Sequence, residues 1–259
     1  MAVAATDLMS LQNKAARYLD ELGISYEKLT EDELEVFEAS FNRQFVLAFP
    51  QREIKDLFLR HKQEILMGAM VAKDQMSAAF EGQFPSSNKI GMCDIRAGFL
   101  GIGDDWEDAG SWTTGSPQNW IHSGTTLLGG TSGNPIRIGE NAVHVVIAVG
   151  SKHPSPKLES VYFEIDGKPK PVITTHFATR LVPYGALPIK ELDDAILLYK
   201  NKELLAKCFF SATFGSTVTD YPYLLGASFI KEPQLRIQDP YTLCGTSAAR
   251  DAHKVVLTT

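Results

Sequence analysis

Several residue patterns that mark common kinds of functional site are missing from this chain of 259 residues. Its three cysteines, Cys93, Cys208 and Cys244, are odd in number and far apart, so the sequence contains neither a disulfide framework nor a CxxC metal knuckle. The six histidines show no HxH, HxxxH or HExxH spacing. We therefore expect no catalytic residue, no metal ligand, no cofactor and no enzymatic activity.

Clusters of basic residues and long apolar runs are missing as well. The formal net charge is −6, and no segment gathers enough lysine and arginine to displace counterions from phosphates, which argues against strong direct nucleic-acid binding. No apolar run approaches the roughly 20 residues that cross a bilayer, and residues 1–7 lack the charged and apolar regions of a signal peptide. We expect a protein that is made in the cytoplasm and does not contact a membrane.

The first part of the chain has the apolar periodicity of helices. Apolar residues between positions 8 and 22 recur at three- and four-residue spacings, which puts Tyr18 and Leu22 on the apolar face of a first helix. Thr30 and Glu33 form a capping box ahead of a second helix. The apolar residues from Ile54 to Phe80 predict one further helix of about 30 residues, about 45 Å long. A rod of that length more often braces a domain or crosses a subunit interface than lines an active site.

After residue 85 the pattern changes to a loop-rich stretch and then to strands. Val143–Val149 is apolar throughout and predicts a strand buried on both faces. Alternating residues at 158–165 lead into Asp166-Gly167, which predicts a hairpin with a type I′ turn. The spacing in residues 189–210 fits either a helix or two strands, and we favour two strands that meet near residues 200–203. Further strands are expected at Phe177–Val182, Tyr223–Ile230, Leu235–Gln238 and Lys254–Thr258.

These patterns together predict an α+β fold with two regions. Residues 1–85 are expected to form a helical region, and residues 86–259 an antiparallel β-sandwich of the jelly-roll kind with eight or so short strands. Apolar residues make up 44% of the chain and charged residues 22%, which is the balance of a folded protein with a substantial core.

An acidic loop contains the best candidates in the sequence for cation binding or for a hydrolase site. Asp104, Asp105, Glu107 and Asp108 lie close together in sequence, as the oxygen ligands of Ca²⁺ do. An EF-hand loop that began at Asp104 would need an oxygen ligand where Trp106 stands, so the EF-hand template fails. The same carboxylates are the candidates for a hydrolase whose site is assembled only in three dimensions, because sequence does not give the distance between two carboxylates.

Aromatic residues give the loop-rich stretch a binding character. It contains Trp106, Trp112 and Trp120, and tryptophans on loops serve as anchors of protein interfaces or as platforms for sugar rings. His61 lies on the apolar face of the predicted long helix, where a core or interface histidine is expected rather than a metal ligand. We take these four residues as interface candidates, with a glycan-binding or adhesin module as the alternative.

Three segments of the second region resemble viral coat proteins whose subunit is a β-sandwich or jelly roll. They are a strand with a tight turn at Pro156–Lys168, the strand Leu204–Phe214 and the late strand Asp220–Ile230. The resemblance implies a capsid subunit of the virion, assembled in the host cytoplasm, whose partners are copies of itself and other virion proteins. The alternative is the mixed α+β coat fold of tailed phages, which contains a long spine helix. The acidic helical region differs from coats that grip RNA with a basic arm, which implies that a packaged genome would be enclosed passively.

Overall fold

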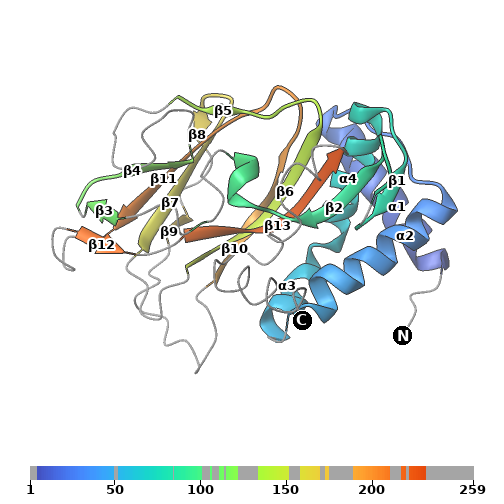
Figure 1. Cartoon of the computed structure of the whole chain (residues 1–259), viewed down its shortest axis with the longest axis horizontal. Coiled ribbons are helices and arrows are strands. Elements are labelled where there is room, and N and C mark those ends of the chain that lie inside the picture. Colours follow the sequence, from blue (N-terminus) through green and yellow to red (C-terminus); the bar gives the residue numbers. More distant parts are fainter. Residues whose placement is uncertain are drawn as a thin grey trace, which may run out of the picture.

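Helices gather at one end of the molecule, and two β-sheets with a short two-stranded ribbon make up the rest (Figure 1). The computed structural model describes residues 5–49, 52–83, 85–100, 106, 111–113, 115–121, 134–151, 158–169, 173–174, 189–210, 217–219 and 222–231. Within these residues the strands pair antiparallel, except for one parallel pair. The α+β class predicted from the sequence is confirmed.

The helical end of the described chain contains four α-helices: α1 (Ala5–Leu22), α2 (Glu31–Phe41), α3 (Arg52–Arg60) and α4 (Lys62–Met76). A π-helix at Asn42–Leu47 extends α2. The predicted capping box is present, because the Glu33 N–H donates to Thr30 Oγ1 at 3.3 Å and the Thr30 N–H donates to the Glu33 carboxylate at 2.8 Å. α1 ends before Gly23, whose φ of +65° glycine adopts at low cost.

The single long helix predicted after Ile54 is wrong, because the chain bends at His61. There the backbone takes φ −93° and ψ 16°, which separates α3 from α4. The two helices pack against different partners. Phe58 of α3 stacks on Phe45 with ring centroids 4.4 Å apart, whereas α4 is buried from Ile65 to Lys73 against the first sheet. The apolar residues from Ile54 onward are therefore buried in two separate helices, one before and one after the bend, and not along one straight helix.

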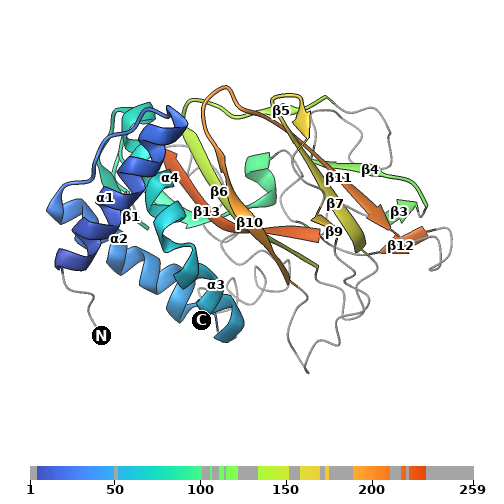
Figure 2. The ribbon, with the colours of Figure 1, turned by 180° about the vertical axis from the view of Figure 1, so that it is seen from behind.

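The first sheet has the order β1-β2-β13-β6-β10, with β1 (Phe80–Gly82), β2 (Ile90–Asp94), β13 (Pro222–Lys231), β6 (Ala142–Ser151) and β10 (Ile189–Leu198). The predicted strands Val143–Val149 and Tyr223–Ile230 are confirmed as parts of β6 and β13. α4 packs on one face of these two strands (Figure 2). At Gly68 a β-carbon would overlap Val145 and lie 2.7 Å from the Phe229 ring, so glycine allows the helix to approach the sheet this closely.

β10 is the outer strand of this sheet among the described residues, and it carries a wide bulge. β10 pairs with β6 at Glu191 and again from Ile196, whereas β6 has only Ile147 between the matching positions. Residues 192–195 therefore bulge out of the ladder, and Asp194 within them is exposed. Bulges and charged residues at a sheet edge block uncontrolled pairing with another strand.

The second sheet has the order β4-β11-β7-β8, with β5 added on β11 and β9 added on β7. Its strands are β4 (Gln118–Ile121), β5 (Ile136–Arg137), β7 (Leu158–Ile165), β8 (Lys168–Pro169), β9 (Ile173–Thr174) and β11 (Glu203–Phe210). The ribbon pairs β3 (Ser111–Thr113) with β12 (Thr217–Thr219), and a short 3-10 helix covers Ala97–Leu100.

Two tight turns follow the sequence prediction. Asp166 and Gly167 have φ values of 52° and 69°, as a type I′ turn requires at both central positions. Residues 189–210 form β10 and β11 rather than a helix, and the strands are joined near Asn201, whose φ is 67°. Three predicted strands lie outside the described residues, namely Phe177–Val182, Leu235–Gln238 and Lys254–Thr258.

The core runs through both ends of the molecule. Buried apolar residues from the helices and from both sheets belong to one cluster, including Leu19 of α1, Met70 of α4, Val146 of β6 and Phe163 of β7. The helical layer is therefore packed onto the first sheet, and the predicted division of the chain at residue 85 remains a prediction.

Candidate functional site

One row across the first sheet brings together side chains of the types used in nucleophilic catalysis. Cys93, Ser228 and His144 lie opposite one another on β2, β13 and β6, and Ser228 Oγ lies 2.8 Å from His144 Nδ1. Burial lowers the pKa of His144 to about 4 and raises the pKa of the Cys93 thiol to about 12. The imidazole is therefore neutral and the thiol protonated at pH 7. All three side chains are buried, so the row is a core contact and not an open catalytic site.

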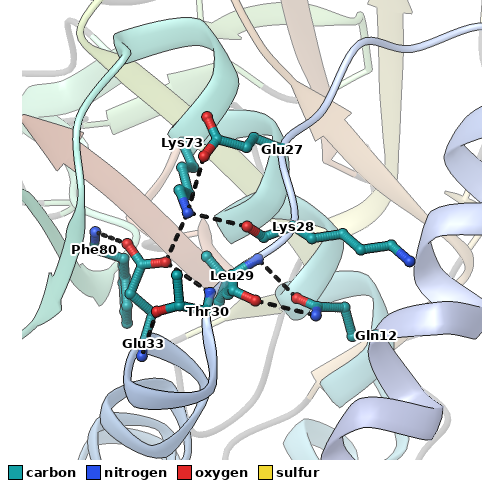
Figure 3. A network of polar contacts seen from close by, with 8 residues as sticks. All are labelled: Gln12, Glu27, Lys28, Leu29, Thr30, Glu33, Lys73 and Phe80. Carbon is teal, nitrogen blue, oxygen red and sulfur yellow. Dashed lines mark hydrogen bonds and ion pairs between the residues drawn. The ribbon is translucent and has the colours of Figure 1, made fainter.

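A second polar cluster joins the helices to β1, with Lys73 of α4 at its centre (Figure 3). Lys73 Nζ donates to Glu33 Oε2 at 2.7 Å and to Glu27 Oε1 at 3.0 Å. It also donates to the backbone carbonyl of Lys28 at 3.0 Å. All three protons of the ammonium therefore have acceptors.

Both oxygens of the Glu33 carboxylate also accept hydrogen bonds. Besides Lys73, it accepts from the backbone N–H of Thr30 at 2.8 Å and of Phe80 at 3.0 Å. Burial alone would raise the pKa of Glu33, but these hydrogen bonds outweigh it and lower the pKa. Burial alone would likewise lower the pKa of Lys73, and its carboxylate partners raise it instead. Lys73 therefore stays protonated at neutral pH and is not an amine nucleophile. Glu33 stays ionised, but its lowered pKa makes it a weak base and both of its oxygens already accept hydrogen bonds, so it is poorly suited to act as a general base.

Gln12 ties α1 to the same region. Its side-chain oxygen accepts from the Leu29 N–H at 2.8 Å, and its side-chain nitrogen donates to the Leu29 carbonyl at 3.2 Å. The amide is buried and paired at both ends, which fixes the segment between α1 and α2. The helical end is thus a rigid support with no open position for a substrate in its polar network.

A third polar cluster holds the bend at His61 against β10. Glu191 accepts from Arg60 at 3.1 and 2.6 Å, and His61 Nε2 lies 2.9 Å from the same carboxylate. The hydrogen bond from Arg60, supported by His61, keeps the pKa of Glu191 below its usual value. On the other side of the ring, His61 Nδ1 lies 3.9 Å from Glu64 Oε1. His61 thus bridges the helices and the first sheet within one chain, and its role at a subunit interface remains a prediction.

A groove of about 580 Å³ lies next to this cluster, between the helices and β10. Tyr18 and Leu22 of α1 line one side, and Leu197 of β10 lines the other. The charged residues of the lining are Glu64, Asp166, Asp194, Lys168 and Lys202, and Lys202 forms an ion pair with Asp166. The groove has the size of a binding site, and its lining combines apolar side chains with charges of both signs.

Sequence reasoning missed this groove because Tyr18 and Leu22 fit the apolar periodicity of α1. In the structure they are 43% and 52% exposed, whereas Leu19 between them is fully buried. An apolar stripe wider than the face a helix can bury is the signal that could have pointed to an exposed contact surface.

Two of the three predicted interface tryptophans are buried in the core. Trp106 is 5% exposed and Trp120 is 1% exposed, and their ring centroids are 5.9 Å apart. Trp112 lies in β3. A ring inside the core offers no surface to a partner, so the structure gives no support to an interface role for Trp106 and Trp120, and that role remains a prediction.

The acidic loop falls outside the described residues, since Asp104, Asp105, Glu107 and Asp108 are not among them. In the part of the chain that the structure describes, no three histidine, cysteine, aspartate or glutamate side chains come together as metal ligands do. No helix in that part is long and apolar enough to cross a bilayer.

No family model, no curated protein and no solved structure matches this chain. Function must therefore be inferred from the pairing of its strands and from the surfaces described above.

Proposed function

We propose that this protein is a self-assembling structural subunit, specifically a viral capsid subunit built on a jelly roll. The pairing of the strands carries the proposal. Eight of the thirteen described strands form a nested set: taken in chain order they are β2, β4, β6, β7, β9, β10, β11 and β13, and each pairs antiparallel with its counterpart counted from the other end. β2 pairs with β13, β4 with β11, β6 with β10, and β7 with β9.

This nested pairing is what a jelly roll requires. A jelly roll can be described as one long two-stranded antiparallel ribbon that is rolled up. In the ribbon the first strand pairs with the eighth, the second with the seventh, the third with the sixth and the fourth with the fifth. Rolling up the ribbon places two of these strand pairs side by side in each sheet, and one new strand pairing joins them. β13 pairs with β6 in the first sheet, and β11 pairs with β7 in the second. Eight-stranded jelly rolls form the domains of viral coats and of lectins, which supports the capsid proposal without excluding a lectin.

The exposed side chains favour assembly over glycan binding. A sugar platform needs exposed aromatic rings, and Trp106 and Trp120 are buried. The exposed large apolar side chains of the described chain all lie on the helical layer, within residues 9–59, and are Met9, Tyr18, Leu22, Leu47 and Leu59. Apolar side chains left in water on one layer support a contact surface there. We infer that the helical layer faces neighbouring subunits in the virion, which are copies of this chain or other virion proteins.

Light scattering coupled to size-exclusion chromatography, with negative-stain microscopy, tests the proposal on the purified full chain. We expect closed particles or oligomers far heavier than the 28.5 kDa chain, across several salt concentrations and pH values. Leu59→Asp should reduce the assembled fraction, because it places a charge on the apolar helical surface. Glu203→Lys, at an exposed position of β11, is the control and should leave assembly unchanged. A chain that stays monomeric under all conditions refutes the proposal.

A further inference from the structure

Tyr18 gives the groove beside β10 an aromatic ring that solvent can reach. Tyr18 lines the groove and is 43% exposed, whereas Trp106 and Trp120 are buried in the core. Leu22 of α1 and Leu197 of β10 line the groove as well. An exposed aromatic ring in a hollow is a surface on which the apolar face of a ligand ring can pack.

Three polar side chains of the lining form no hydrogen bond or ion pair among the described residues. They are Gln63 of α4, Lys168 of β8 and Asp194 in the bulge of β10. Lys168 and Asp194 are exposed, and Gln63 is partly buried. The groove therefore offers unused groups of each kind, because a carboxylate accepts hydrogen bonds, an ammonium donates them and an amide does both.

The charges that a ligand can reach in this groove are of opposite sign. Lys202 forms an ion pair with Asp166, which leaves Lys168 and Asp194 as the exposed charges without such a partner among the described residues. Glu64 Oε2 is sealed inside the fold and is not available to a ligand. A ligand with a single net charge would be attracted by one of the two exposed groups and repelled by the other, so the groove favours a ligand without net charge.

A saccharide makes use of all of these groups. Each sugar hydroxyl donates one hydrogen bond and accepts two, so hydroxyls can serve a carboxylate, an ammonium and an amide alike. The C–H face of a sugar ring is apolar and packs on an aromatic side chain. A small zwitterion would also match the two charges, but it would leave the Gln63 amide and the Tyr18 ring without a role.

We propose that this groove binds a neutral saccharide, with one sugar ring packed on Tyr18 and its hydroxyls hydrogen-bonded to the Gln63 amide and the Asp194 carboxylate. The Lys168 ammonium donates to a further hydroxyl. The groove has a volume of about 580 Å³, within the range of about 300–1,000 Å³ for small-ligand sites, which admits a short oligosaccharide.

This binding activity goes beyond self-assembly and does not rest on it. Three of the five exposed large apolar side chains of the described residues, Met9, Leu47 and Leu59, do not line the groove. They remain available for the subunit contact proposed for the helical layer. A saccharide in the groove is therefore compatible with an assembled shell.

A glycan array that carries neutral and sialylated oligosaccharides, probed with the purified full chain, tests the proposal. Calorimetric titration of the strongest array ligand then gives the dissociation constant. We expect binding to neutral saccharides, with a dissociation constant about tenfold higher for Tyr18→Ala, which removes the ring, and for Asp194→Ala, which removes a charged acceptor. Asp193→Ala is the matched control, because Asp193 is exposed in the same bulge but does not line the groove, and it should bind like the native chain.

Circular dichroism confirms that each variant is folded, and light scattering follows its assembly. A chain that binds no saccharide, or only sialylated ones, would overturn the saccharide site, as would a Tyr18→Ala variant that binds as tightly as the native chain. Tyr18→Ala should still assemble, and loss of its assembly would assign the ring to a subunit contact instead. A native chain that binds neutral saccharides but stays monomeric would refute the proposed function and leave the saccharide site standing.

Discussion

Replacing Lys73 with methionine removes the cation from the network of Figure 3 while keeping most of the side chain's volume. Glu33 then remains buried with the N–H groups of Thr30 and Phe80 as its donors. Both side chains of the ion pair are only 10% exposed. Removing one partner of a buried ion pair costs about 3–5 kcal/mol, and because two donors remain we expect a loss of about 3 kcal/mol in the free energy of unfolding.

Urea unfolding followed by circular dichroism measures this loss, and Lys200→Met provides the matched control. Lys200 Nζ lies 2.6 Å from Glu140 Oε1, but these side chains are 44% and 72% exposed. An exposed pair contributes less than about 1 kcal/mol, so the same substitution there should cost little. Equal losses for Lys73→Met and Lys200→Met would refute the reasoning, because they would mean that burial does not strengthen the first pair.

The dependence on pH gives an independent check with a defined sign. In the native chain the pKa of Glu33 is lowered from its ordinary 4.5, so its stabilising contribution is present above that pH and is lost as the pH falls through the lowered value. In the Lys73→Met variant the carboxylate has lost its cation, and burial raises its pKa. We expect the stability difference between variant and native chain to narrow between pH 7 and pH 5. A difference that is constant over this range would contradict the assignment of the loss to Glu33.

Two further outcomes follow from the packing of the first sheet. Gly68→Val should reduce the free energy of unfolding by about 2–3 kcal/mol, because the added atoms overlap Val145 and Phe229. Gly139→Val is the control, since no heavy atom lies within 4 Å of a β-carbon there, and it should cost far less in the same urea titration. Cys93 should resist thiol reagents in the native protein at pH 8 and react in urea, because it is buried and burial raises the pKa of its thiol to about 12. Labelling is measured by peptide mapping, and native Cys93 that is labelled as fast as Cys93 in urea would contradict this prediction.

Features set by neighbouring residues could be predicted from the sequence. The capping box of Thr30 and Glu33 depends on residues three positions apart, and the turn at Asp166-Gly167 depends on two adjacent ones. Both features are present in the structure because the residues that stabilise them are neighbours in the sequence, so their interaction does not depend on the rest of the fold. The bend at His61 was not predictable in this way, because it depends on Glu191, a residue 130 positions away.

The order of the strands and the groove could not be predicted, because both depend on contacts between distant segments. Gly91 pairs with Ile230, and no local pattern encodes that partnership. The burial of Trp120 could not be predicted for a related reason: its polar neighbours suggested a loop, whereas it belongs to a strand whose four residues are all buried. The strand alternation and turn chemistry indicated an antiparallel β region, but not which strands pair within it.

The position of β13 between β2 and β6 has a consequence for synthesis on the ribosome. A nascent chain that has not yet released residue 231 holds β2 and β6 with no strand to join them. α4 then lacks part of the surface on which it packs, because Gly68 lies against Phe229 of β13 as well as Val145 of β6. Contacts between distant segments form late and slowly. The sheet that carries the helical layer is therefore completed only after nearly the whole described chain has been translated. Truncated translation products would therefore lack the complete sheet on which α4 packs.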